Sequence, residues 1–265
     1  MHLMSDITIP DFSGEDVERL IGSIRSAVEG TGCKGVVIGL SGGIDSAVVT
    51  KLCADAIGPE KVLNVFMPTL VTPFDDYRAT LDLANLFGTE YKVVNVQPAV
   101  DALAAVLLTD KETPLENGNI AARCRMIVLY NLAKKRNYIV IGTSNRSELM
   151  MGYFTKYGDG GCDVMPMAGL YKTEVRQIAK AIGVPDDIIA KPPSAGLWEG
   201  QTDESEMGIT YAHLDRILYG IYDLGLKDEE IAGGTGFPVE EVSDIRRRSA
   251  SMEHKRMAPL SLGRL

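Results

Sequence analysis

Residues 40–46 read Leu-Ser-Gly-Gly-Ile-Asp-Ser and lie between a short apolar run, residues 36–40, and a helical stretch, residues 45–56. Two consecutive glycines let the backbone come close to a ligand, and the first amide groups of a helix have no partner within that helix. Such a turn from strand to helix favours a bound phosphate or pyrophosphate. The segment therefore predicts an α/β fold with an anion site at the end of its first strand.

Strands and helices alternate on both sides of this segment. Ser13 and Asp16 have the spacing of a capping box for a helix that precedes the first strand. Thr72 is a predicted helix cap, with Pro73 as the first helical residue and Asp75 completing the box. The other expected strands are residues 62–67, 91–96 and 138–142, and the expected helices include residues 17–28, 98–108 and 117–136. Continuous apolar strands separated by helices indicate a parallel sheet with helices on both faces, and such sheets bind ligands at the carboxyl ends of their strands.

The pattern changes after residue 142. Residues 153–170 and 192–209 are rich in Gly, Pro and polar residues and are expected to be functional loops. Helices are expected at residues 173–182, 206–222, 227–232 and 238–252. We therefore expect one α/β domain over residues 1–265, with a twisted, mainly parallel sheet between helices. Its parts are a core at residues 14–190, a mobile loop at 191–209 and a helical C-terminal extension at 210–265.

Composition excludes several classes of protein. Hydrophobic residues make up 45% and charged residues 24% of 265 residues, as in ordinary globular domains. The formal net charge of −9 argues against nucleic acid as a partner, because nucleic-acid-binding surfaces are basic. No apolar run has the length of a membrane helix, and the N-terminus lacks the features of a secretory signal. The four cysteines form no C-x-x-C pair and the three histidines no H-E-x-x-H motif, so we expect a cytoplasmic protein without zinc ligands.

Asp45 makes the segment unusual. The segment lacks the Gly-Lys-Ser/Thr ending of a Walker A loop, and it is not a G-x-G-x-x-G motif. A bare carboxylate repels phosphate oxygens, whereas one that holds Mg²⁺ binds them through the metal. The structural alternative is an Asp that merely interacts with the helix dipole. With these residues the segment resembles the S-G-G-x-D-S loop of ATP pyrophosphatases, enzymes that cleave ATP between the α- and β-phosphates.

Further segments resemble the NAD synthetases among the ATP pyrophosphatases. They are residues 118–130, 142–148, 155–163, 169–175, 192–198 and 253–256. The resemblance extends over about residues 14–260. It implies ATP-dependent amidation of deamido-NAD with ammonia, giving NAD, AMP and pyrophosphate through a carboxyl adenylate. It also implies Mg²⁺ as cofactor and a homodimer.

The resemblance assigns roles to individual residues. ATP would be bound by Gly39, Leu40, Ser41, Gly42, Gly43, Ile44, Asp45, Ser46, Thr143, Lys172 and Ser194. Deamido-NAD would be bound by Arg123, Lys156, Asp163, His254 and Lys255. Asp45 and Glu148 would hold Mg²⁺ and, together with Lys172, form the catalytic group. At position 194 many relatives carry Thr, and the Ser of this chain preserves the hydroxyl.

Each of these residues also has a purely structural alternative. Glu148 can be a first-turn carboxylate, and His254 can be a dipole partner near a helix end. Lys156 and Lys172 can be solvated surface charges. Arg123 can be present only as a good helix former.

The residue types nevertheless suit the chemistry. Mg²⁺ and cations such as Lys172 would offset the charge that develops when a nicotinate carboxylate attacks the α-phosphorus of ATP. Ammonia would then attack the activated carbonyl, with AMP as the leaving group. Most of the remaining work is positioning, so a Ser/His/Asp constellation is not required. A base that deprotonates ammonium stays unassigned, with Asp163 as a candidate.

Three rival interpretations remain. Residues 228–242 have the pattern of a helix-turn-helix, but residues 201–265 hold 8 basic and 12 acidic side chains, which would repel DNA. Other enzymes with an ATP-pyrophosphatase loop thiolate transfer RNA or synthesise GMP. Transfer-RNA thiolation would favour paired catalytic cysteines and a basic face that binds RNA. Relatives that use glutamine carry an N-terminal amidase domain, for which the 35 residues before the first strand leave no room. Free ammonia is therefore the expected nitrogen source, with a separate glutaminase as a further option.

Overall fold

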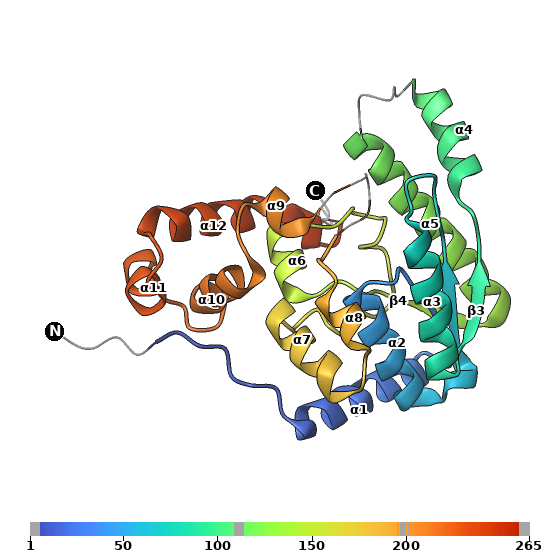
Figure 1. Cartoon of the computed structure of the whole chain (residues 1–265), viewed down its shortest axis with the longest axis horizontal. Coiled ribbons are helices and arrows are strands. Elements are labelled where there is room, and N and C mark those ends of the chain that lie inside the picture. The colour runs from blue at the N-terminus through green and yellow to red at the C-terminus, as the bar shows by residue number, and fades with distance from the viewer. Residues whose placement is uncertain (1–5, 109–113, 195, 197–199, 201, 260–265) are drawn as a thin grey trace, which may run out of the picture.

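Four parallel strands form the centre of the fold, in the order β3-β2-β1-β4 (Figure 1). The computed structural model describes residues 6–108, 114–194, 196, 200 and 202–259. The strands are β1 Gly35–Gly39, β2 Val62–Phe66, β3 Glu90–Val93 and β4 Tyr138–Ile141. Val36 of β1 is in register with Val62 of β2 on one side and with Ile139 of β4 on the other. The predicted parallel sheet is thus confirmed, and the carboxyl ends of β1 and β4 lie next to each other.

Helices surround this sheet on both faces. In the α/β part they are α1 Gly14–Gly30, α2 Ile44–Ile57, α3 Phe74–Phe87, α4 Gln97–Leu107, α5 Pro114–Arg136, α6 Arg146–Met151, α7 Lys172–Ala181 and α8 Asp186–Ala190, with a 3₁₀ turn η1 at Pro59–Lys61. In the C-terminal part they are α9 Asp203–Met207, α10 Tyr211–Tyr222, α11 Asp228–Thr235, α12 Val239–Ser251 and α13 Glu253–Arg256. Among the described residues no helix combines the length and the apolar character needed to span a bilayer.

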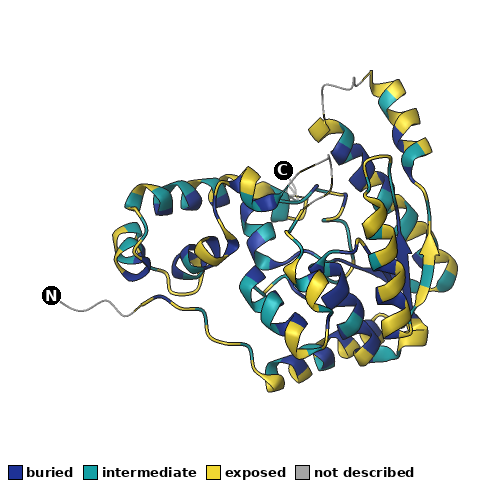
Figure 2. Ribbon diagram, in the orientation of Figure 1, coloured by how far each residue is buried: buried dark blue, intermediate teal, exposed yellow. Residues whose placement is uncertain are grey.

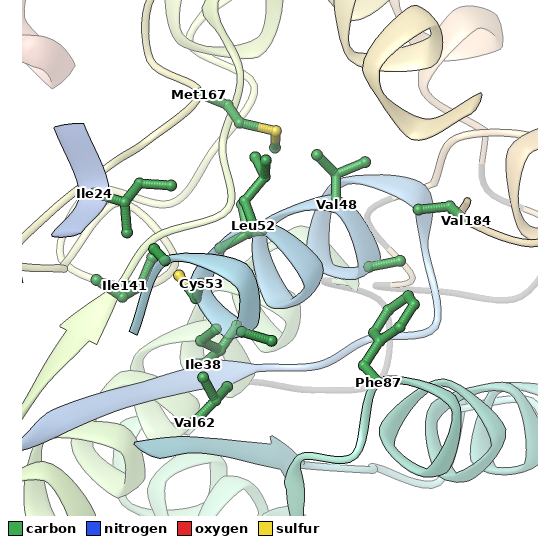
Figure 3. Packing of buried hydrophobic residues seen from close by; sticks show 14 of the residues in the cluster. Ile24, Ile38, Val48, Leu52, Cys53, Val62, Phe87, Ile141, Met167 and Val184 are labelled. Carbon is green, nitrogen blue, oxygen red and sulfur yellow. The ribbon is translucent and has the colours of Figure 1, made fainter. Parts of the chain in front are cut away.

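Alternate residues of β1 separate the two faces of the sheet. Ile38 points to the face covered by α1, α2 and α7, and Figure 3 shows Cys53 of α2 on the side of that helix nearest Ile38, while Leu52 points away toward Met167. Val37 points to the opposite face, covered by α4 and α5. This alternation follows from the two-residue period of a strand. Because both faces are covered, all three central residues of β1 can be apolar.

The C-terminal helices have an apolar core of their own. Residues of α10, α11 and α12 pack together there, among them Leu214, Ile231 and Val242, and Figure 2 shows these inner faces buried. Arg246 and Arg248, which follow the segment with the helix-turn-helix pattern, donate to the protein's own groups, Leu226 O and Met207 O. This packing matches the expected helical C-terminal extension.

Most expected elements are confirmed, with differences at their ends. The capping box of α1 forms, since Asp16 N donates to Ser13 Oγ and Ser13 N to Asp16 Oδ2. The Thr72 cap is wrong, because α3 begins one residue later with Pro73 as its cap. The Thr72 hydroxyl instead accepts a hydrogen bond from Thr69 N, which closes the preceding turn. The strand expected at 91–96 ends at Val93.

The helix expected at 206–222 is wrong in its first part. Gly208, with φ of 72°, ends α9, and α10 begins only at Tyr211. The loop expected at 192–209 therefore contains a short helix. Parts of this loop, residues 195, 197–199 and 201, lie outside the described residues. The short helices α8 and α13 were not expected, because four or five residues are too few for a periodic pattern.

Candidate active site

The loop after β1 is folded by its two serines. Ser46 Oγ accepts a hydrogen bond from Ser41 N at 3.1 Å and donates to Gly43 O at 3.0 Å. Gly43 N in turn donates to Ser41 Oγ at 3.3 Å. Gly42 has φ of 80°, a conformation that favours glycine and lets the chain reverse here. The sequence thus closes a tight loop around the start of α2.

The N-terminus of α2 offers backbone amides to a ligand. Gly43 is its N-cap residue and no side chain caps the helix. The predicted contacts of Leu40 and Ile44 can only be made by their backbone, because both side chains lie in the apolar core. Asp45, in the first turn, is only partly buried, with 19% of its side chain exposed. This arrangement of amides and one carboxylate fits a metal-bound phosphate.

A capping box at the start of α6 holds the second carboxylate. Glu148 N donates to Asn145 Oδ1 at 3.0 Å, and Asn145 N donates to Glu148 Oε2 at 3.3 Å. The same Asn145 side chain donates through Nδ2 to Asp45 Oδ1 at 2.9 Å. The cap therefore fixes the loop after β4 and joins both predicted metal ligands in one network.

Lys172 completes this network from the first turn of α7. Its Nζ forms an ion pair with Asp45 Oδ2 and a second one with Glu148 Oε1 at 3.2 Å. Only 1% of the Lys172 side chain is exposed, so the alternative of a solvated surface charge is wrong. Residues 127 positions apart in the chain thus meet at one point, near the carboxyl ends of β1 and β4. We call Asp45, Glu148 and Lys172 the charged centre.

Electrostatics within the charged centre hold the lysine protonated. Burial disfavours the ammonium of Lys172, but attraction by Asp45 and Glu148 outweighs it and raises the pKa of Lys172. Burial also raises the pKa of Glu148, while the nearby ammonium opposes this rise. The centre is therefore a cation held between two carboxylates in a poorly solvated place.

A third carboxylate lies beside the charged centre and was missed in the sequence. Asp203 of α9 is 3% exposed, and its Oδ2 accepts a hydrogen bond from Tyr211 OH at 3.0 Å. The Lys172 ammonium lies 5.2 Å from the centroid of the Tyr211 ring. Burial raises the pKa of Asp203 and the charge of Lys172 lowers it, so the two side chains interact.

Two predicted ATP contacts form no hydrogen bond with this network in the part of the chain that the structure describes. Thr143 follows the carboxyl end of β4 and is partly buried. Ser194 is exposed, and its hydroxyl accepts a hydrogen bond from Gly196 N at 3.1 Å. Within the described part of the chain, no hydrogen bond joins Ser194 to the charged centre. The geometry therefore leaves the role of Ser194 as a prediction.

Four of the five residues predicted to bind deamido-NAD are connected. Arg123 on α5 donates to Lys156 O at 3.4 Å, and Lys156 Nζ donates to His254 O at 2.6 Å. Lys255 Nζ, next along α13, donates to Gly152 O. The structure thus brings α5, the loop after α6 and α13 together into one basic group.

Asp163 lies apart from this basic group. Its Oδ2 accepts a hydrogen bond from Val140 N at 2.8 Å, and its Oδ1 accepts one from Tyr130 OH at 3.0 Å. Both carboxylate oxygens of Asp163 therefore accept hydrogen bonds beside β4. These bonds help to order the loop that contains Asp163. Its candidate role as a base stays a prediction.

Signals for the missed residues were present in the sequence. Asn145 and Glu148 have capping-box spacing, which predicts contact between them but not with Asp45. Asp215 occupies the apolar stripe of α10 together with Leu214 and Leu218. A carboxylate on a buried stripe indicates a specific partner, although the spacing alone could not name that partner.

Comparison with known proteins agrees with this geometry. The family model described as NAD synthase matches residues 16–259. The NH₃-dependent NAD⁺ synthetase of Thermococcus sibiricus is 46% identical over 244 residues, which are 92% of this chain and 95% of that protein. The structure of NMN synthetase from Francisella tularensis has a TM-score of 0.83 and 35% identity, covering 95% of this chain and 99% of that one.

A further solved structure has the same fold over nearly its whole length. The NH₃-dependent NAD synthetase from Campylobacter jejuni matches with a TM-score of 0.77 and 31% identity, covering 93% of this chain and 97% of that one. The expected resemblance is thus confirmed, and so is the reaction class, that of a ligase which forms a C–N bond with ATP. The chain is a member of the NAD synthase family.

Proposed function

We propose that this enzyme amidates deamido-NAD with ammonia and cleaves ATP to AMP and pyrophosphate. The observation that carries the proposal is the charged centre, in which Lys172 is buried between Asp45 and Glu148. It adjoins the start of α2, where no side chain caps the helix and the first-turn backbone amides suit the phosphates of ATP. A cation and two carboxylates at this place match a reaction that joins two polyanions.

The donor set of the charged centre fits Mg²⁺. This ion is usually bound by one or two carboxylates together with substrate phosphates, and Asp45 and Glu148 both reach one ammonium. Over the described ranges no group of three or more Asp, Glu, His or Cys side chains is arranged to hold a metal. Phosphate oxygens of ATP would therefore complete the coordination. Bound Mg²⁺ would neutralise charge on the transferring and leaving phosphates.

The residues of the chain would divide the remaining work. The hydrogen bonds of Ser41 and Ser46 would hold the loop at residues 41–46 in shape, and the backbone amides of the first turn of α2 would orient the phosphates of ATP. The nicotinate carboxylate would then attack the α-phosphorus, giving a carboxyl adenylate and pyrophosphate. Lys172 would stabilise the charge that develops on the phosphates. Ammonia would attack the adenylate carbonyl, forming the amide and releasing AMP.

The basic group supports binding of the dinucleotide substrate. Arg123, Lys156 and Lys255 bring three cations to the junction of α5, the loop after α6, and α13. Their attraction would hold the pyrophosphate or carboxylate of deamido-NAD. Because α13 belongs to the C-terminal extension, we propose that core and extension act as one unit.

One assay tests the proposed reaction. The protein is incubated with deamido-NAD, ATP, Mg²⁺ and ammonium, and NAD, AMP and pyrophosphate are followed. All three products should appear in equal amounts. When glutamine replaces ammonium, almost no NAD should form. Formation of ADP and phosphate would contradict the mechanism.

Asp45→Asn tests the proposed metal ligand. The substitution removes the charge but keeps the shape, so folding should persist while turnover falls by roughly 100-fold or more. Asp55→Asn is the matched control, because Asp55 lies on the same helix in an exposed pair with Lys51. Unchanged turnover of Asp45→Asn would remove Asp45 from the site.

A second candidate substrate is the mononucleotide. The structural similarity to an NMN synthetase favours it, because that enzyme's product carries the same nicotinamide group on one nucleotide. Nicotinate mononucleotide and deamido-NAD should therefore be compared at equal concentration. We expect kcat/KM to be higher for deamido-NAD, and a higher value for the mononucleotide would make this chain an NMN synthetase.

We also propose that the enzyme is a homodimer, joined through α4 and α5. Exposed apolar side chains gather on these two helices, which pack against each other. They are Leu103, Val106 and Leu107 on α4 and Leu115 and Ile127 on α5. Figure 2 shows the exposed side of α4 at the upper right. Apolar groups of this size gain free energy when a second copy covers them.

A further inference from the structure

Asp215 is a fully buried carboxylate for which the proposed reaction has no use so far. It lies on α10, in the C-terminal extension, and is 0% exposed. Its Oδ1 accepts a hydrogen bond from Ser147 Oγ at 2.5 Å, and its Oδ2 accepts one from Thr173 N at 2.8 Å. Among the described residues it forms no ion pair, so its charge is stabilised mainly by these donors, with a weaker attraction from the charge of Lys172.

The two donors belong to the helix starts that carry the charged centre. Ser147 is the neighbour of Glu148 in the first turn of α6. Thr173 is the neighbour of Lys172 in the first turn of α7. Ser147 Oγ also accepts a hydrogen bond from Lys172 N at 2.9 Å. One carboxylate thus fixes the first turns of both α6 and α7. The backbone amide of Lys172 is linked to Asp215 through one hydroxyl group, that of Ser147.

A purely structural role would not require a charge at this position. Burial of a carboxylate costs free energy, and well-packed apolar residues usually serve stability as well or better. A carboxylate does provide two directed, charge-assisted hydrogen bonds at the starts of helices, where backbone amides lack other partners. The feature that needs such directed bonds here is the relative placement of α6 and α7, which sets the distance between Glu148 and Lys172.

We propose that Asp215 is a positioning residue, which acts through Ser147 and the first turn of α7 to hold the Lys172 ammonium between Asp45 and Glu148. The C-terminal extension thereby takes part in ATP binding without touching ATP. This inference rests on the proposed function only for its effect on turnover. Its effect on ATP binding can be measured by itself.

Asp223 provides a matched control. It also lies at the end of α10 and also binds both helices, since it accepts hydrogen bonds from Arg146 Nη1 at 3.0 Å and from Tyr171 OH at 2.6 Å. Arg146 and Tyr171 are the chain neighbours of Ser147 and Lys172, but among the described hydrogen bonds neither Arg146 Nη1 nor Tyr171 OH is bonded to Ser147 Oγ or to the Lys172 amide. We expect Asp223→Asn to weaken the docking of α10 while the bonds of Asp215 to Ser147 and Thr173 still hold the first turns of α6 and α7.

The experiment measures Mg²⁺-ATP affinity by calorimetry in five proteins: wild type, Asp215→Asn, Lys172→Ala, their double variant and the control Asp223→Asn. We expect Asp215→Asn to weaken ATP binding about tenfold in the wild-type background and less than twofold when Lys172 is already absent. Asp223→Asn should change the affinity less than twofold. The inference would be overturned if Asp215→Asn weakened ATP binding equally in the wild-type and Lys172→Ala backgrounds, or if it did not weaken ATP binding at all.

Turnover and a second variant complete the test. Asp215→Asn should lower kcat at least about tenfold with little change in KM for deamido-NAD, because the basic group is elsewhere. A wild type that forms no NAD would refute the proposed function, whereas the coupling in ATP affinity would still decide the role of Asp215. If Asp215→Asn does not fold, Ser147→Ala takes its place, because it removes the hydroxyl that links Asp215 to Lys172 N. Ser147→Ala should weaken ATP binding much more in the wild-type background than in Lys172→Ala. Equal effects in the two backgrounds would equally overturn the inference.

Discussion

Lys172 determines the electrostatics of the site at the scale of single residues. Its ammonium is the only charge that separates the carboxylates of Asp45 and Glu148 among the described ion pairs. Without a cation these carboxylates would repel each other and an incoming phosphate. The ammonium therefore stabilises the site before substrate arrives and remains available to neutralise phosphate charge afterwards.

Removal of this ammonium should destabilise the fold in a way that Mg²⁺ corrects. Lys172→Met leaves two close carboxylates without a cation, so the free energy of unfolding should fall by about 2–4 kcal/mol. Because the same carboxylates fit Mg²⁺, the ion should raise the Tm of this variant more than that of wild type. Lys51→Met, which breaks an exposed pair with Asp55, should cost less than about 1 kcal/mol. Equal Mg²⁺ effects on wild type and Lys172→Met would contradict the proposed site.

Asp215 should give the stability a recognisable pH dependence. Burial raises its pKa from 3.8 to about 6, against the hydrogen bonds from Ser147 and Thr173 and the charge of Lys172. Between these two values the native state binds more protons than the unfolded state, so stability falls as pH rises from about 4 to 6 and is level above that. The loss attributable to this group is on the order of 3 kcal/mol.

Comparison with Asp215→Asn isolates this contribution. Urea unfolding of both proteins gives the difference in their free energies of unfolding at each pH. Wild type should lose stability relative to the variant between pH 4 and 6, and the difference should then stay constant to pH 8. A difference that is independent of pH throughout would show that Asp215 titrates alike in both states.

At the scale of elements, glycine conformation decides where helices end. Gly208 has φ of 72° and separates α9 from α10, whereas the apolar periodicity alone predicted one helix from residue 206. Its position places Asp203 of α9 against Tyr211 of α10. The break therefore brings a third carboxylate to the charged centre.

A pair of glycine substitutions tests this difference. Gly208→Ala should lower stability by about 1 kcal/mol, because its left-handed backbone disfavours a Cβ even though no atom lies within 4 Å of it. Gly22→Ala, inside α1 and with equally free space, should raise stability by about 0.5–1 kcal/mol. Thermal unfolding measures both, and a stabilising Gly208→Ala would contradict the helix break.

At the scale of the whole molecule, two apolar cores meet at the site. One lies between the sheet and α1, α2 and α7, and the other lies within the C-terminal helices. Tyr171 belongs to the second core while its neighbour Lys172 belongs to the charged centre. The junction of the two cores thus fixes the start of α7, and misplacement of either core would displace the ammonium.

The exposed apolar surface of α4 and α5 gives a prediction about assembly. Val106→Glu places a charge where 76% of an apolar side chain is exposed, so it should convert a dimer to a monomer. Sedimentation velocity measures the change. Leu224→Glu, exposed in the C-terminal part, is the control and should leave the dimer intact. A wild-type monomer, or a dimer of Val106→Glu, would contradict the proposed interface.

The sequence by itself determined the strands, the loop after β1 and the types of residue in the charged centre. Apolar runs and helix starts are local patterns, because a strand or a cap depends on neighbours a few residues away. The motifs were enough to select Asp45, Glu148 and Lys172 as candidates. The spacing of these residues in the sequence, however, could not distinguish a common site from separate exposed charges.

Only the tertiary structure decided that these charges meet. Parallel pairing of β1 with β4 brings together helix starts 100 or more residues apart in the chain. It also decided that Asp203 and Asp215 of the C-terminal helices face this centre, because their partners are set by the packing of one core on another. Contacts between residues so far apart in the sequence depend on the three-dimensional path of the chain. No local pattern of residues specifies that path.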